Sequence, residues 1–275
     1  MSLSDPQQYF LQTMMNKGVI NQIDFSKIFD NITQKFKLNY NGKTKKEFIP
    51  MFIKEINYLI KKFSMEIKSG VCEHTGLSFY CFIRQSDTSG IGKLSTLYSQ
   101  VELKIFKKIL VLIVNSEDGF IERNTLLNQI ICEDDEIQTQ VAKNVTSRDI
   151  RLAIEKFIHD FWLYEIPDKK ERLALHGRAV LELNEYLNEI FDETTLNYCP
   201  LCKKLVLCGV SCDTCLKKVH FSCGKMYFAR EKKCPNVIGK CTDTFSDDKI
   251  NDFIEKLETA KNAYKQANVA HQNQE

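Results

Sequence analysis

Eight of the eleven cysteines in this 275-residue chain lie between residues 199 and 241. Two pairs of them have a spacer of two residues, which lets one tight turn direct both sulfur atoms at the same metal ion. A histidine and a cysteine with the same spacer form a third pair, and a looser pair of cysteines ends the run. The candidate metal ligands are therefore Cys199, Cys202, Cys212, Cys215, His220, Cys223, Cys234 and Cys241.

Zinc is the metal that this ligand set favours, because it binds cysteine and histidine in tetrahedral groups of four. Eight ligands fill two tetrahedra and leave no open position for a reactive water, so we expect two structural zinc ions and no metal-based hydrolysis. Cys208 is left over; it could in principle replace a ligand, although its position between two pairs is the poorer geometry. A segment this short cannot bury enough apolar surface to fold alone, and two structural zinc ions can supply the deficit.

Other uses of the cysteines are less consistent with the sequence. The odd total and the lack of a secretory signal disfavour a disulfide framework. A thioredoxin-like redox motif would need a strand–helix context, which follows neither pair. We therefore expect reduced thiols in an intracellular protein.

Composition sets the limits on the rest of the chain. Hydrophobic residues at 43% and charged residues at 27% exclude a wholly disordered chain, a collagen-like fibre and a coiled-coil rod. There is no apolar run long enough for a transmembrane helix, so we expect a soluble protein without a membrane partner. The net charge of +2 conceals an acidic stretch over 97–198 and a basic one over 199–241.

Residues 1–96 predict three helices followed by a two-stranded hairpin, which is the order of a winged-helix domain. Gly18 is suited to end the first helix, and Thr44 with Glu47 can form a capping box before the third. Beyond residue 64, apolar residues alternate on both sides of a turn at 74–76 and predict the hairpin. The second helix is indicated by apolar residues spaced by three and four, at Phe25, Ile28, Phe29, Ile32 and Phe36.

Residues 97–193 repeat this order and predict a second winged helix. A hairpin is expected across 162–175, followed by a last helix over 177–191 with His176 as a structural corner before it. The acidic balance of this module disfavours phosphate contacts, which need clustered Lys and Arg. The first module is a weak candidate for a phosphate contact through Lys43, Lys45, Lys46, Lys61 and Lys62. For both modules, we expect binding to other proteins rather than to DNA.

The fold class that follows is mostly α with small β wings. It comprises tandem winged-helix domains in residues 1–96 and 97–193 and a two-zinc finger in residues 194–245. Residues 246–275 are expected to form a short amphipathic helix, which Ser246 can cap, and then a polar disordered tail.

The ligand order of the finger resembles two families of cross-braced zinc fingers, the RING fingers of ubiquitin ligases and the PHD fingers that read histone tails. In both families the first and third ligand pairs share one metal, and the second and fourth pairs share the other. The resemblance implies one zinc ion at Cys199, Cys202, His220 and Cys223, and a second zinc ion at Cys212, Cys215, Cys234 and Cys241.

The RING type is the better match. PHD fingers carry a tryptophan shortly before the last pair, whereas Trp162, the only one here, lies outside the finger. RING fingers have a branched apolar residue between the first two cysteines and a proline after the seventh ligand. Leu201 and Pro235 match these positions, which implies that they contact a ubiquitin-conjugating enzyme. The spacing between Cys234 and Cys241 departs from the RING pattern, which closes with a two-residue spacer.

Up to about residue 241, the chain resembles the non-structural maintenance of chromosomes element 1 family, the RING-bearing subunits of the structural maintenance of chromosomes (SMC) five–six complex. The finger's ligand order is one part of this resemblance. The other parts are YFLQTMMNKGVI near the start, VNSEDGF at 114–120 and LALHGRAVLELNEYL at 173–187. The phrase LHGRA, just before a helix that leads into the finger, is the most specific of them.

This resemblance implies a nuclear, chromatin-associated protein of DNA repair and DNA recombination. Its implied partners are a MAGE-type third non-SMC element, a kleisin-like fourth element and a ubiquitin-conjugating enzyme, with DNA reached mainly through the complex. The implied enzyme activity is partner-dependent RING-type ubiquitin transfer. Such a ligase needs no catalytic nucleophile, because it docks a loaded conjugating enzyme and holds its thioester in a reactive pose.

Two alternatives belong to other functional classes. A catalytically weak structural subunit would use its zinc finger and winged helices only as protein-binding surfaces in the same complex. A sequence-specific DNA binder would bind duplex DNA tightly and in a salt-dependent way as an isolated chain. The acidic middle of the chain disfavours the second alternative.

Overall fold

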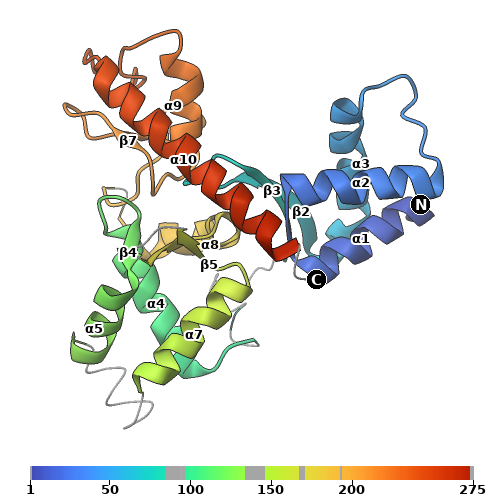
Figure 1. The fold of residues 1–275 in the computed structure, drawn as a ribbon, viewed down its shortest axis with the longest axis horizontal. Coiled ribbons are helices and arrows are strands. Elements are labelled where there is room, and N and C mark those ends of the chain that lie inside the picture. Colours follow the sequence, from blue (N-terminus) through green and yellow to red (C-terminus); the bar gives the residue numbers. More distant parts are fainter. Residues whose placement is uncertain are drawn as a thin grey trace. The chain divides into compact units, whose positions relative to one another are not determined.

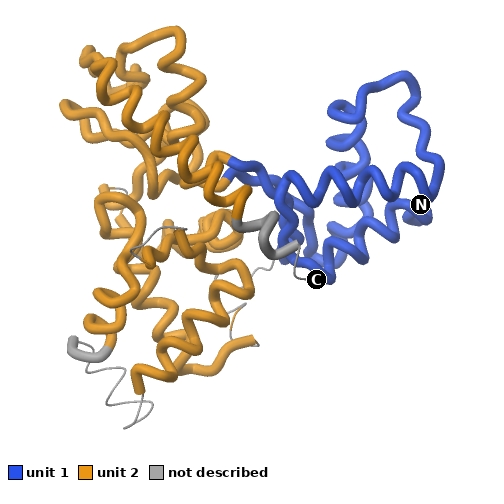
Figure 2. The backbone as a smooth tube through the Cα atoms, in the orientation of Figure 1, with its two compact units in different colours: residues 1–71, 77–88 blue, residues 72–76, 89–275 orange. Residues whose placement is uncertain are grey.

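The computed structural model describes residues 2–84, 94, 97–133, 146–166, 171–192 and 194–272, which form helices and small sheets (Figure 1). They fall into two compact units (Figure 2). The first unit comprises residues 1–71 and 77–88, and the second comprises residues 72–76 and 89–275. Residues 72–76 thus belong with the second unit, although they form the turn between two strands of the first.

The first unit is a winged helix. Its three-stranded antiparallel sheet has the order β1-β3-β2, so β3 is central and pairs with both neighbours. Aromatic rings fill the core, where Phe52 packs edge-on against Phe10 and Phe29 with ring centroids 5.7 and 5.5 Å away. The elements are α1 (Asp5–Lys17), β1 (Val19–Asn21), α2 (Gln22–Phe36), α3 (Lys45–Ile60), a 3-10 turn (Lys61–Phe63), β2 (Met65–Val71) and β3 (Ser78–Arg84).

Side-chain caps fix where the helices of this unit begin. Ser4 and Gln7 form a capping box at α1, and Thr44 and Glu47 form the predicted box at α3. The side chain of Asn21 accepts the first free N–H groups of α2. These caps satisfy backbone donors that have no partner inside the helix.

The second unit begins with a second winged helix that repeats the element order of the first. Its sheet has the order β4-β6-β5, again antiparallel with the last strand in the centre. The finger and a long C-terminal helix follow. The elements are α4 (Gln100–Val114), β4 (Phe120–Glu122), α5 (Arg123–Glu133), α7 (Ser147–His159), β5 (Leu163–Ile166), β6 (Arg172–Leu175), α8 (Gly177–Ile190), β7 (Val210–Ser211), β8 (Lys218–Val219), α9 (Phe221–Phe228) and α10 (Asp247–Gln272).

The phrase LHGRA has a structural role in this second winged helix. His176 caps α8, because its Nδ1 accepts the backbone N–H of Arg178 at 3.0 Å. The Arg178 guanidinium stacks on the ring of Trp162, 4.7 Å from its centroid, and donates to the carbonyl oxygen of Asp160 at 2.9 Å. The predicted structural corner at His176 therefore joins the start of α8 to the chain that follows α7.

The finger and the second winged helix share one hydrophobic core. Leu196, Leu205 and Leu207 pack in the same buried cluster as Phe157 and Trp162 of the winged helix. The backbone of the finger also comes close to the turn in VNSEDGF. Gly119 there has φ +73°, and a Cβ atom added to it would lie 2.6 Å from the Leu207 carbonyl group. Only glycine fits this turn without displacing the finger.

Helix α10 corrects the expectation of a disordered tail. The polar segment from residue 263 onward continues the helix as far as Gln272. Phe253 and Leu257 are buried on one side of α10, and the ring of Tyr264 lies 6.4 Å from that of Tyr164. Packing of this side supplies stability that the sequence of the segment alone does not indicate.

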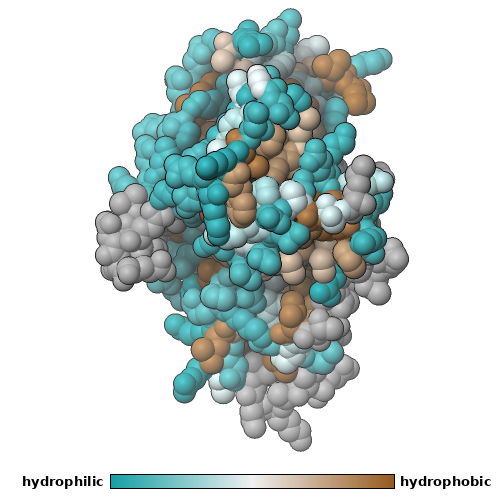
Figure 3. Space-filling model, turned by 90° about the vertical axis from the view of Figure 1, so that its right-hand side faces the viewer, coloured by the Kyte–Doolittle hydropathy of each residue, from teal (hydrophilic) through white to brown (hydrophobic). Residues whose placement is uncertain are grey.

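The face drawn in Figure 3 is mostly hydrophilic, with apolar residues between the polar ones. Within the described ranges, no helix has the length and apolar character needed to span a bilayer.

We predict that His176→Asn weakens the pH dependence of folding. Burial, with Arg178 acting in the same direction, lowers the pKa of His176 from 6.5 to about 4. The folded chain therefore holds the neutral ring, whose contribution to stability is complete above pH 6.5 and is lost as the pH falls toward 4. Asparagine also caps helices but does not titrate.

The free energy of unfolding should therefore fall by about 1 kcal/mol less in the variant than in the wild type between about pH 7.5 and 5.5. Chemical denaturation at the two pH values measures this difference. Equal losses in the two proteins would contradict the assignment of a neutral cap.

Candidate metal centre

Two tight turns of the same kind present the first two ligand pairs. The backbone N–H of Lys203 donates to the Cys199 carbonyl oxygen at 2.8 Å, and that of Leu216 donates to Cys212 at 3.0 Å. Lys203 and Leu216 both adopt left-handed backbone conformations, with φ of 62° and 57°. The repeated geometry turns both cysteines of each pair to one side.

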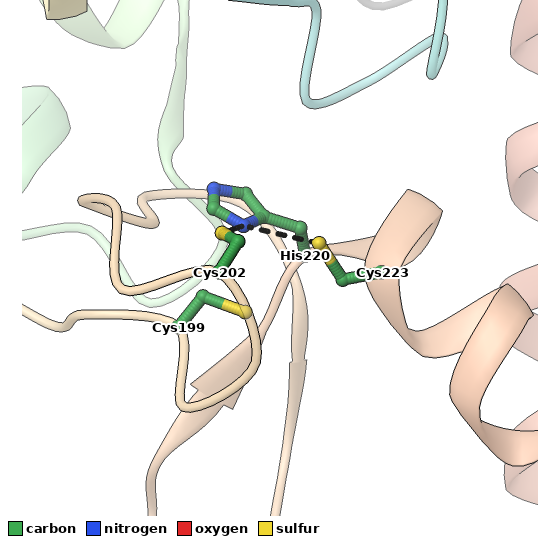
Figure 4. Close-up of side chains that lie close together, drawn as sticks. All are labelled: Cys199, Cys202, His220 and Cys223. Atoms are coloured by element: carbon green, nitrogen blue, oxygen red, sulfur yellow. Dashed lines mark hydrogen bonds between the residues drawn. The ribbon is translucent and has the colours of Figure 1, made fainter.

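The first group consists of Cys199, Cys202, His220 and Cys223, whose ligand atoms all lie within 4.8 Å of one another (Figure 4). His220 is the N-cap residue of α9, and Cys223 lies in the first turn of that helix. The Nδ1 atom of His220 is 3.3 Å from the Cys202 sulfur and 3.9 Å from the Cys223 sulfur. The imidazole thus presents Nδ1 to the sulfur atoms.

The ligand residues of this group shift one another's pKa values. A hydrogen bond from Cys223 lowers the pKa of Cys199 to about 3. Burial lowers the pKa of His220, but its hydrogen bonds to Cys199 and Glu73 outweigh burial and raise the pKa to about 11. A metal ion that binds Nδ1 would therefore release a proton.

The second group consists of Cys212, Cys215, Cys234 and Cys241. The sulfur of Cys212 lies 3.8 Å from that of Cys241, and the sulfur of Cys215 lies 3.7 Å from that of Cys234. The long spacer between Cys234 and Cys241 does not keep this pair apart, because the intervening residues form a compact turn.

The two groups have the cross-braced pairing of a RING finger. Each offers four sulfur or nitrogen donors within tetrahedral reach, which fits a closed structural metal site. Cys208 lies in neither group. Its sulfur is 3.5 Å from Nδ1 of His74, and burial raises its pKa, so this thiol stays protonated.

Leu201 and Pro235, the two expected contacts of a conjugating enzyme, lie in different surroundings. Leu201 is partly buried and lines an apolar groove beside the first group. Pro235 is buried and does not line this groove. The other lining residues are Cys202, Cys223, Met226, Tyr227, Ala229, Arg230 and Glu231.

Sequence reasoning missed two carboxylates beside the ligands. Glu73, in the turn between β2 and β3, has its Oε1 3.0 Å from Nε2 of His220. Asp243 has its Oδ2 3.3 Å from the sulfur of Cys212. The place of Asp243 just after the last ligand is a signal that could have indicated it. Glu73 has no such signal, because it lies far upstream of the finger.

Comparisons with known proteins agree with this architecture. Residues 7–183 match the family described as "Nse1 non-SMC component of SMC5-6 complex", and residues 199–237 match a "RING-like domain". The human protein named "Non-structural maintenance of chromosomes element 1 homolog" is 31% identical over 236 residues, covering 85% of this chain and 83% of the human one. The rat protein of the same name is 29% identical over 249 residues, covering 90% and 86%.

A solved structure is also similar. A chain from a structure named "Nse1-Nse3-Nse4 complex" superposes with a TM-score of 0.71 at 24% sequence identity. The match covers 89% of this chain and 97% of that one. It therefore supports the fold over most of the chain.

We predict that Cys241→Ser lowers the metal content from two ions per chain to one, whereas Cys208→Ser leaves it at two. Serine is a poor ligand in a thiolate site, so the first change opens the second group, while the second removes a sulfur outside both groups. Native mass spectrometry of the two variants measures the content. A lost ion in Cys208→Ser would mean that Cys208 is a ligand.

Proposed function

This chain belongs to the Nse1 family, and on that premise we propose that it is a RING-type ubiquitin ligase subunit of an SMC5-6 complex. The observation that carries the proposal is the apolar groove beside the first ligand group. Leu201 lies in it, between the first two ligands, where the RING resemblance places the contact with a conjugating enzyme.

The metal in both groups is zinc in this proposal. Thiolates and one imidazole suit zinc, whereas magnesium and calcium prefer oxygen ligands. Zinc would hold the turns of the finger together and leave no coordination position open for a reaction. The chain's own residues then provide the docking surface.

The conjugating enzyme docks on Leu201 and Met226. Met226 projects from α9 and is 71% exposed, although it lines an apolar groove. Arg230 and Glu231 provide polar groups along the same groove. An apolar centre with a polar rim is typical of protein–protein contacts. Since Pro235 is buried, we assign the docking to Leu201 and Met226.

Ubiquitin transfer requires no nucleophile from this chain. The cysteines of the finger lie in the two ligand groups, except for the buried, protonated Cys208. The finger acts by holding the thioester of the docked enzyme where an amine can attack it. Fixing reactants in a productive orientation is itself a source of rate enhancement.

The proposed partners are a MAGE-type third non-SMC element and a kleisin-like fourth element, which stimulate the ligase. The support is the solved relative, which comes from a complex whose name contains Nse3 and Nse4. In this setting the protein acts in the nucleus, on chromatin, in DNA repair and DNA recombination. It reaches DNA mainly through the complex.

A second candidate function is a structural subunit whose finger is only a protein-binding surface. The observation that favours it is that the C-terminal part of the finger departs from the RING pattern. The RING-like match stops at residue 237, before the last ligand, and Pro235 is buried. The surface that a conjugating enzyme would meet thus differs from that of a RING finger on this side.

We predict that Leu201→Ala reduces the discharge of ubiquitin from a loaded conjugating enzyme by on the order of tenfold, as expected for truncating a central apolar contact. The chain should be assayed alone and with its MAGE-type partner, against a panel of conjugating enzymes. Metal content is recorded on the same samples, because the substitution should leave both zinc ions in place.

Leu216→Ala is the matched control. This leucine is 70% exposed on the finger and does not line the groove, so its truncation should leave discharge unchanged. Two zinc ions with no discharge from any enzyme of the panel would favour the structural subunit. Equal losses in the two variants would mean that the groove is not the docking site.

A further inference from the structure

We propose that Glu73 is a positioning residue for the first metal site, where it orients the His220 ring toward the ion. This inference rests on the proposed metal and not on ligase activity. Glu73 lies in the turn formed by residues 72–76, well outside the finger in sequence. The first group therefore contacts a carboxylate from outside the segment that carries its ligands.

The two nitrogens of His220 face different partners. Nδ1 points to the sulfur atoms of the first group, whereas Nε2 points away from them (Figure 4). Nε2 lies 3.0 Å from Oε1 of Glu73 and 2.9 Å from the carbonyl oxygen of Leu205. Both partners are acceptors, so Nε2 carries the hydrogen and Nδ1 is the nitrogen left to bind a metal. Such an outer hydrogen bond fixes both the tautomer and the orientation of a ligand histidine.

Glu73 is itself held in place by the finger. Its Oε2 accepts the backbone N–H of Cys208 at 2.8 Å and that of Leu207 at 3.2 Å. Its side chain is only 13% exposed, and that of His220 is 12% exposed. A buried carboxylate with three donors around it keeps one orientation, because leaving any donor unpaired there is costly. The contact is therefore a fixed part of the site.

The second metal site has no comparable contact from outside the finger among the described residues. The carboxylate next to it belongs to Asp243, only two positions after the ligand Cys241, and its Oδ2 lies near the Cys212 sulfur. Removal of Glu73 should thus affect one site and spare the other. This coupling is reciprocal. If the docked turn at 72–76 raises the metal affinity of the first site by some factor, bound metal raises the equilibrium constant for docking of that turn by the same factor.

The test uses the full chain and measures the affinity of each site by competition with a chromophoric chelator. Cobalt serves as the spectroscopic probe, since sites with three sulfurs and one nitrogen absorb differently from sites with four sulfurs. We expect Glu73→Gln to weaken the first site by about 10- to 100-fold, the usual cost of losing an outer-shell partner. The second site should keep its affinity.

Glu66→Gln is the matched control, because it removes a carboxylate of β2 whose ion pair is with Lys68. It should change neither site. A wild-type chain that binds no metal would refute the metal assignment itself. An unchanged first site in Glu73→Gln, with metal present, would refute the role of Glu73 alone.

A double-mutant cycle separates positioning from a general loss of structure. His220→Cys converts the first group to four sulfurs, with no ring left to orient. Both groups then have four sulfurs, so the chains of this cycle also carry Cys241→Ser, which opens the second group and leaves only the first to bind cobalt. In that background Glu73→Gln should change the first-site affinity by less than about twofold. A loss as large as in the wild-type background would mean that Glu73 acts only through the backbone of residues 207 and 208, and would overturn the proposal.

Discussion

The finger depends on its two groups of four ligands. Apart from the ligands, the buried apolar residues of its core cluster between 199 and 245 are Val206, Val210, Val219, Phe228 and Phe245. So small a core does not offset the conformational entropy of ordering the segment, and metal ions held by the two groups would supply the difference. Because the pairing is crossed, each ion would tie together segments that are far apart in the sequence.

Packing against the second winged helix and α10 also stabilises the finger. Its leucines complete the core of the second winged helix, and α10 covers its other side through Phe253. The backbone at Gly119 of the second winged helix lies so close to Leu207 of the finger that a side chain at residue 119 would push the two apart. The finger and the second winged helix therefore form one unit, and a core substitution such as one at Leu205 would affect both.

Local signals made most of the fold predictable from the sequence. Thr44 and Glu47 marked the start of α3, and the alternation around Phe79 and Cys81 marked β3. The ligand spacing indicated the finger, and its resemblance to RING fingers implied the grouping that is observed. In each case the information lies within a few residues of the element, or in a spacing that a metal dictates.

Features set by tertiary contact were not predictable. Strand β1 has only three residues, too few for alternation to show, and it exists because β3 pairs with it. The continuation of α10 beyond residue 263 brings Tyr264 against Tyr164, and the burial of Pro235 depends on how the last turn closes. Glu73 meets His220 across 147 positions, a separation that no local pattern records.

The sequence distance of that contact has a consequence for the order of folding during translation. Chains emerge from the ribosome N-terminus first, so residues 72–76 exist well before His220 and its neighbours have been made. In that interval the carboxylate of Glu73 is solvated, and β2 and β3 can pair around an undocked turn. The turn can settle only after the finger has been synthesised, which makes its docking a late event, after the first winged helix has had time to fold.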